Sequence, residues 1–264
     1  MPENRVRINR ATMTVFLLAL ALIALSALGC SSLPQLVQKG RDAKTIKPSG
    51  VIISETREVS GFTALDIRTV GKVVLTQGDS ESLAISGSDN LVPLVVTRVS
   101  NGTLIIETKE NIALTGLHSD NVPTFEIALK DLSKLTLSGL ATVEMEALAT
   151  SGLEVTVSGA GGFKLDDLSA NSVDIALSGF GNVEIAGQVT GQAIAISGAG
   201  QVDNAGLECK TAEVDVPGLG TATIWVTDKL TGEISGGGSV RYYGSPETDT
   251  ETTGLGRFEA LGAK

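Results

Sequence analysis

The sequence predicts an all-β protein built as a single-stranded parallel β-helix, or β-solenoid. It would have about seven rungs of 18–20 residues and a less regular N-terminal β cap. Three observations lead to this fold class. Ser-Gly pairs recur at a nearly constant interval, apolar and polar residues alternate around them, and 31 glycines occur with only 3% aromatic residues. The alternation indicates strands with one buried face, and repeats of about 20 residues must stack to bury that face.

The repeat is aligned on one glycine in each unit, the corner glycine. These are Gly139, Gly159, Gly179, Gly198, Gly218, Gly236 and Gly254, at spacings of 20, 20, 19, 20, 18 and 18. Serine precedes five of them, and a second glycine follows two positions later in six of the seven units. Glycine is expected at a corner because it permits a positive φ or a close backbone approach. Stacking in register would align like residues in columns, including a ladder of serine hydroxyls, at about 4.8 Å per rung.

Other β-rich folds fit this pattern poorly. A βαβ protein would show segments of helical period between its strands, and none is evident over residues 133–264. A β-sandwich would need hairpin turns and variable spacing instead of a fixed unit. The parallel β-solenoid is therefore the predicted fold.

Residues 51–132 precede the regular rungs at 133–264 and are expected to form one continuous domain with them. Thr69–Leu75 resembles an early rung corner, and Asn101-Gly102 between two apolar runs predicts a hairpin. Thr124–Leu129 is another alternating strand. We expect this region to start the solenoid and to cover its open end, since a bare sheet edge templates aggregation.

Residues 1–29 predict a lipoprotein signal peptide. Three arginines among the first ten residues precede an apolar run, Val15–Leu28. That run suits a signal peptide and is shorter than the roughly 20 residues of a membrane span. It ends in Leu28-Gly29-Cys30, which resembles the bacterial lipobox. The resemblance implies that the Cys30 thiol is acylated and that the chain is cleaved before it; the alternative is an ordinary secretory signal.

Residues 30–50 are expected to form a flexible tether, because they contain Pro, Gly and Ser without periodicity. Ser31 after the cysteine implies an outer-membrane destination in a diderm host, and otherwise the outer face of the cell membrane. The formal net charge of −10 divides into +2 for residues 1–29, +3 for 30–50 and −15 for 51–264. The basic tether either rests on anionic lipid headgroups or is a solvated spacer. The acidic body argues against a nucleic-acid partner, which requires clustered Lys and Arg.

Several motifs, in their order along the chain, resemble the bacterial head GIN domain family. They are REVSGFTALDI at 57–67, the Ser-Gly-x-Gly rungs, and VRYYGSP at 240–246. The resemblance covers about residues 57–260. It implies a secreted or lipid-anchored protein with a β-helical fold and a surface-binding role. The family's members are named as auto-transporter adhesins, and the resemblance implies no catalytic residues.

Few residues are candidates for catalysis. His118, the only histidine, lies in a polar stretch that predicts a loop. Cys209 falls in an alternating stretch and is expected to pack in or near the ladder. The adjacent Asp166 and Asp167 are expected in a solvated turn, since no further carboxylate follows one unit later. We therefore predict no catalytic residue, no metal site and no cofactor.

One constellation predicts a ligand site. Trp225 and Tyr243 each lie seven positions after a corner glycine, so stacking would place them on adjacent rungs. Arg241 and Thr223 lie two positions earlier on the same face. An aromatic pair beside a cation can stack on a sugar ring; the alternative is a patch that closes the C-terminal rungs.

The predicted function is that of a non-enzymatic, lipid-anchored module of the cell envelope. It would bind or scaffold a glycan or protein ligand through its outer faces and contact the membrane through its N-terminal lipid. The alternative is a glycan-active β-helix enzyme of the lyase or hydrolase type, which would need clustered carboxylates.

Overall fold

The computed structural model describes residues 43–118 and 120–264. The predicted signal peptide, Cys30 and most of the predicted tether lie outside this range. The chain divides into two compact units. The smaller one contains β1 (Lys44–Ile46) and most of β8 (Ile112–Leu114), which pair in a two-stranded sheet. The larger one comprises residues 47–109 and 114–264. Across the described residues, no helix has the length and hydropathy needed to cross a membrane.

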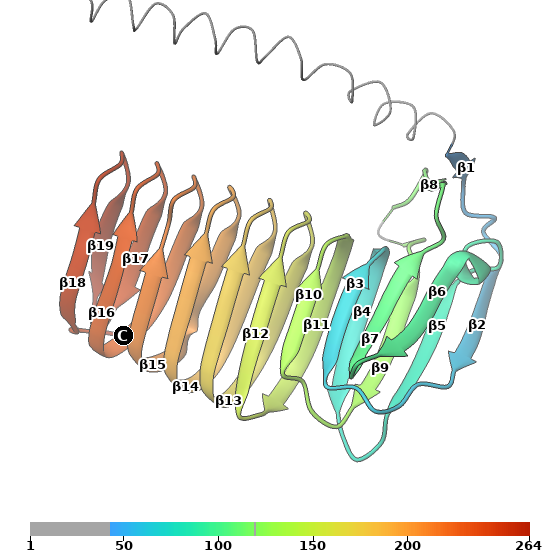
Figure 1. Ribbon diagram of the computed structural model, residues 1–264, viewed down its shortest axis with the longest axis horizontal. Helices are drawn as coiled ribbons and strands as arrows, with labels where there is room; N and C mark the ends of the chain where they lie inside the picture. Colours follow the sequence, from blue (N-terminus) through green and yellow to red (C-terminus); the bar gives the residue numbers. More distant parts are fainter. Residues whose placement is uncertain (1–42, 119) are drawn as a thin grey trace, which may run out of the picture. The chain divides into compact units, whose positions relative to one another are not determined.

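The larger unit is a parallel β-solenoid, which confirms the predicted fold class (Figure 1). The seven corner glycines bound about six turns. The regular turns consist of β10 (Lys134–Leu137), β11 (Leu140–Ala149), β12 (Gly152–Val157), β13 (Gly162–Leu177), β14 (Asn182–Ile196), β15 (Gln201–Asp215), β16 (Thr221–Ile234), β17 (Ser239–Tyr243), β18 (Glu247–Thr252) and β19 (Arg257–Gly262). Each strand pairs in parallel with the strand one turn later, as the repeat predicted.

The corner glycines form a column in which each backbone lies against the preceding turn. A Cβ atom on Gly179 would lie 2.0 Å from the carbonyl oxygen of Gly159, and one on Gly198 would lie 2.1 Å from that of Gly179. None of the seven corner glycines has a positive φ. The close backbone approach is therefore what requires glycine here, and not a left-handed conformation.

The serines before the corner glycines also follow the stacking of the turns, and their side chains are exposed. Among the described residues, no hydrogen bond joins one of these hydroxyls to the next. The predicted ladder is therefore a column of solvated hydroxyls. The hydrogen bonds at the corner come from the backbone instead, as when the Ser178 N–H donates to the Val157 carbonyl oxygen at 2.9 Å.

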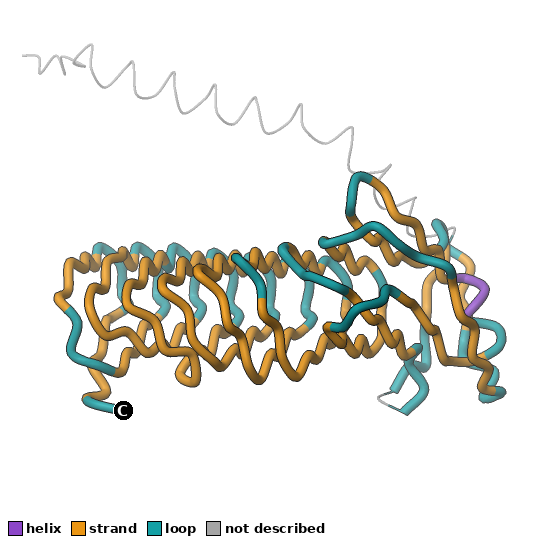
Figure 2. The backbone as a smooth tube through the Cα atoms, turned by 90° about the horizontal axis from the view of Figure 1, so that it is seen from below, coloured by secondary structure: helices purple, strands orange, loops and turns teal. Residues whose placement is uncertain are grey.

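Each turn has two walls whose inward side chains fill the core, and Figure 2 shows these walls running along the solenoid. In β13, Phe163 and Leu165 are buried and Lys164 between them is exposed. The alternation breaks at Asp166 and Asp167, which are both exposed, where the register of β13 with β14 shifts. The chain thereby passes from one wall to the other without burying a carboxylate.

The N-terminal strands form a mixed sheet that continues the solenoid. They are β2 (Ile52–Arg57), β3 (Ala64–Arg68), β4 (Val70–Gln77), β5 (Ser82–Ser88), β6 (Val95–Ser100), β7 (Thr103–Thr108) and β9 (Thr124–Leu129). β3 and β4 pair in parallel with β10 and β11, so the predicted early corner at Thr69–Leu75 is confirmed. The hairpin at Asn101-Gly102 joins β6 to β7, and both residues have the positive φ, 49° and 73°, of its turn type.

Spatial order differs from chain order in this region. β7 and β9 pair in parallel with β3 and β4 on the side away from the regular turns. β5 and β6 then add antiparallel, and β2 pairs antiparallel with β5. The antiparallel strands thus end the parallel stack and cover the start of the solenoid, as expected.

The final turn exposes a polar edge. All six residues of β18 are exposed, and Glu, Asp and Glu alternate with threonine along it. Charged side chains on an edge strand oppose pairing with a strand of another molecule. The β18 edge at this end of the solenoid is therefore protected by charge, whereas the other end is protected by antiparallel strands.

The glycine column predicts a position-specific stability effect. The Gly179→Ala variant should be destabilised by about 1–3 kcal/mol or more, because its Cβ would overlap a backbone carbonyl that cannot move aside. Gly78→Ala is the matched control, because its Cβ would meet no atom within 4 Å and its φ is not positive. Urea denaturation followed by circular dichroism measures both variants. Equal stability of the two would contradict the role assigned to the column.

Candidate functional site

The predicted aromatic pair is assembled on the last regular turns. Trp225 of β16 and Tyr243 of β17 are direct register partners, and both side chains are half-buried. Thr223 and Arg241 are likewise partners, and the Arg241 guanidinium donates a hydrogen bond to the Thr223 hydroxyl at 3.0 Å. The four residues that the repeat placed together thus lie together on one wall.

The cation that faces the two rings is Lys264, which sequence reasoning did not find. Its Nζ atom lies 5.0 Å from the centre of the Trp225 ring and 5.5 Å from that of Tyr243. The same ammonium group donates to the carbonyl oxygen of Ala205. A cation over aromatic faces contributes about 0.5–1 kcal/mol at an exposed site. Lys264 follows the last strand and belongs to no repeat column, so periodicity carried no signal for it.

Cys209 lies in the core, as the sequence predicted. Its side chain is 1% exposed, and burial raises the pKa of the thiol to about 11. The Gln192 amide donates to the Cys209 sulfur at 3.1 Å, and the Asn204 amide donates to the Gln192 carbonyl oxygen at 2.9 Å. Both amides are buried near the register shift that follows Asn204 in β15. This buried chain of polar groups holds a protonated thiol, which is a weak nucleophile.

The remaining candidates are exposed as expected, but Asp166 and Asp167 lie within β13, where its register shifts, and not in the predicted turn. His118 is exposed in a loop, where its backbone N–H donates to the Asn121 Oδ1 atom at 2.6 Å. Asp166 pairs with Lys164 at 2.6 Å, and this hydrogen bond raises the pKa of the exposed lysine. Lys164 also lies 3.9 Å from Glu184 on the next turn, along the expected column of alternating charge. Over residues 43–118 and 120–264, no three or more His, Cys, Asp or Glu side chains are placed to hold a metal.

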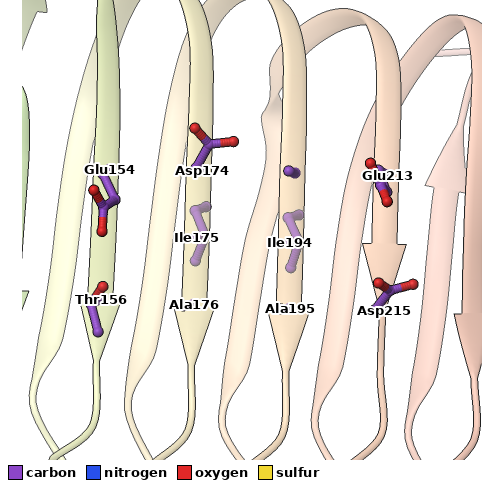
Figure 3. A pocket seen from close by; sticks show the side chains of 10 residues that line it. Glu154, Thr156, Asp174, Ile175, Ala176, Ile194, Ala195, Glu213 and Asp215 are labelled. Carbon is purple, nitrogen blue, oxygen red and sulfur yellow. The ribbon is translucent and has the colours of Figure 1, made fainter.

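One wall carries a shallow depression that we call the acidic trough, with a volume of about 400 Å³ (Figure 3). Its floor contains three alanines, and carboxylates stand around it. The residues are Ala176, Ala193 and Ala195 with Glu154, Asp174, Glu213 and Asp215. The carboxylates are exposed, and Glu154 pairs with Lys134 at 2.7 Å. The trough could have been found in the sequence, because its three alanines occupy columns whose members in neighbouring turns are polar or charged.

A model of the family described as "Putative auto-transporter adhesin, head GIN domain" matches residues 61–246. A search of curated proteins found no match.

Solved structures share the fold over most of the chain. A "putative adhesin" from Bacteroides fragilis NCTC 9343 is 25% identical, with a TM-score of 0.78, and the alignment covers 82% of this chain and 100% of that one. A "putative lipid binding protein" from Parabacteroides distasonis ATCC 8503 is 20% identical, with a TM-score of 0.66 and coverage of 83% and 100%. A "putative adhesin" from Parabacteroides merdae ATCC 43184 is 19% identical, with a TM-score of 0.64 and the same coverage. At these identities the two Parabacteroides structures support the fold alone.

The environment of Cys209 predicts its reactivity. In a Cys30→Ser variant, the remaining thiol should react with Ellman's reagent at pH 8 only after guanidinium unfolds the protein. Because the pKa of this thiol is higher in the folded protein than its ordinary value of 9.0, its contribution to the free energy of unfolding is complete below pH 9. This contribution is lost as the pH rises towards about 11. Rapid labelling of the native protein at pH 8 would show an accessible thiolate and contradict the assignment.

Proposed function

Because the chain belongs to the head GIN domain family, we propose that it is a non-enzymatic, lipid-anchored protein of the cell envelope that binds surface ligands on its outer walls. The observation that carries the proposal is the in-register stacking of turns, which aligns like side chains in rigid columns along each wall. Such columns suit a repetitive ligand, such as a glycan or the surface of another protein. The binding energy then comes from many weak contacts instead of one deep pocket.

The lipid anchor in this proposal is Cys30. The three arginines, the apolar run to Leu28 and the Leu-Gly-Cys ending support export followed by acylation of this cysteine. More than one acyl chain is needed for stable anchoring, since each buried methylene contributes about 0.8 kcal/mol. The acidic body, at −15, would stay soluble and be repelled by anionic lipids, so it would stand off the membrane that holds the anchor.

The proposed ligand contact is the pair formed by Trp225 and Tyr243, with Arg241 beside it. The two rings are fixed by parallel pairing of their strands and are half-exposed, so they form a preorganised apolar platform. Lys264 lies over both rings, so a sugar that stacks on them would displace its ammonium group, which could then donate a hydrogen bond to a sugar hydroxyl. A sugar ring with one apolar face and equatorial hydroxyls fits this combination.

Membrane fractionation tests the anchor. Wild-type protein should stay in the membrane pellet after a carbonate wash, whereas Cys30→Ser should move to the soluble fraction because it has no acylated thiol. Cys209→Ala is the matched control, because it removes the buried cysteine and should remain in the pellet. Retention of Cys30→Ser in the washed pellet would overturn the anchor.

Glycan-array binding tests the ligand contact. Replacing both Trp225 and Tyr243 by alanine should weaken binding to envelope glycans at least ten-fold, because the stacking platform is lost. Leu261→Ala is the control, since Leu261 is an exposed apolar residue on the adjoining β19. Unchanged glycan binding by the double variant would remove the aromatic pair from the proposal.

A further inference from the structure

An exposed apolar column runs along the edge of the solenoid formed by the corners. The residue directly after each corner glycine occupies this column, which we call the apolar comb. Its members are Leu140, Ala160, Phe180, Ala199, Leu219, Gly237 and Leu255. In Figure 1 their turns form the row of pointed loops that includes the loop between β18 and β19.

Large and small residues alternate strictly along the comb. The four large side chains are 59%, 79%, 71% and 97% exposed, from Leu140 through Phe180 and Leu219 to Leu255. An exposed alanine or glycine stands between each pair of them. Because neighbouring strands lie about 4.8 Å apart, the large side chains recur roughly every 9.5 Å. The comb therefore presents apolar knobs separated by gaps of one turn.

The backbone beneath the comb is rigid. Phe180, Ala199, Leu219, Gly237 and Leu255 each donate their N–H to the corner glycine carbonyl of the preceding turn, at 2.9 to 3.2 Å. The knobs are thus held at fixed spacing before any partner arrives, which lowers the entropy lost on binding.

Charge is excluded from the comb and its flanks. From the residue before each corner glycine to the third residue after it, the seven corner segments contain a single charged residue, Arg257. The whole body nevertheless carries −15. Interface cores are depleted in charge in this way. An uncharged edge lets two acidic molecules approach without facing carboxylates.

We propose that two copies of this chain pair through the apolar comb as an antiparallel dimer. A twofold axis between the turns of Phe180 and Ala199 sets three of the four knobs opposite gaps. Phe180 then faces Ala199, Leu219 faces Ala160, and Leu140 faces Gly237 of the second copy. Leu255 faces Val70, which occupies the same column one turn before Leu140.

A parallel twofold pair fits the same pattern poorly. A parallel pair in register would set Phe180 against Phe180 and every gap against a gap, which leaves the comb unpacked. Antiparallel pairing is isologous and closes after two copies. A stable interface buries roughly 800 Å² on each partner, so the contact must extend beyond the four knobs to the small residues and the serine column beside them.

Photocrosslinking in cells tests the arrangement on the full chain. Phe180 is replaced by p-benzoyl-L-phenylalanine, which keeps an aromatic knob, and in a second variant Leu219 is replaced. Irradiation should give a covalent dimer of the chain in both cases. Mass spectrometry should place the first crosslink at residues 198–200 of the second copy and the second crosslink at residues 159–161. Crosslinks at the photoprobe's own turn would show a parallel pair and overturn the proposal.

Substitutions in the comb show whether the crosslinked dimer depends on packing of the knobs or forms by chance collision of two molecules. With the photoprobe at 180, Leu219→Asp should reduce the dimer at least ten-fold, because it sets a carboxylate in an apolar gap. Ile52→Asp is the matched control, since Ile52 is 59% exposed on β2, outside the comb, and should leave the yield unchanged. No dimer from either photoprobe would assign the comb to another occupant, such as a lipid surface or a different protein, and would overturn the proposal.

Discussion

The backbone contact at the corner glycines is the constraint on which the rest of the solenoid depends. Each corner places a glycine Cα against the carbonyl of the previous turn, where a Cβ would approach to between 2.0 and 2.3 Å. This contact fixes the turn-to-turn register at one point in every coil. Once it is fixed, the period of two in each strand determines which side chains enter the core. The aliphatic core and the outer columns are therefore consequences of one repeated backbone contact.

The same stacking creates two open ends, and the chain treats them differently. The C-terminal edge strand β18 carries alternating carboxylates and threonines, all exposed. At the other end, β5 and β6 turn the sheet antiparallel. A parallel solenoid extends by adding further parallel strands, so antiparallel strands end that template and charge opposes the approach of a new one. Both devices limit association to the sides of the molecule.

The regular turns could be predicted because their determinant is local and recurs in the sequence. Seven corner glycines with alternating flanks specify the register, and the Asn101-Gly102 hairpin is equally local. The position of β7 and β9 outside β3 and β4 could not be predicted, since pairing between strands distant in sequence leaves no periodic signal. Lys264 was missed for the same reason: it reaches Trp225 and Tyr243 from a segment that follows the last repeat. Residues 166 and 167 were correctly expected to be solvated but wrongly expected in a turn, because they are exposed by a register shift within β13 that leaves no periodic signal.

In a stacked fold, the residues at one position of the repeat line up in a column and together form a surface. A corner has glycine at its first position and glycine or, once, alanine two residues later, yet the residue between them points outward and is free to be large or small. Selection on that one position over seven turns changes a whole edge of the molecule, without cost to the core. The alternation from Leu140 to Leu255 is thus not required by folding, because alanine or glycine at every turn would stack as well. Exposed leucine and phenylalanine side chains lower the solubility of the protein, and a binding role offsets this cost. The corner edge, together with the walls, is therefore a place to look for partners.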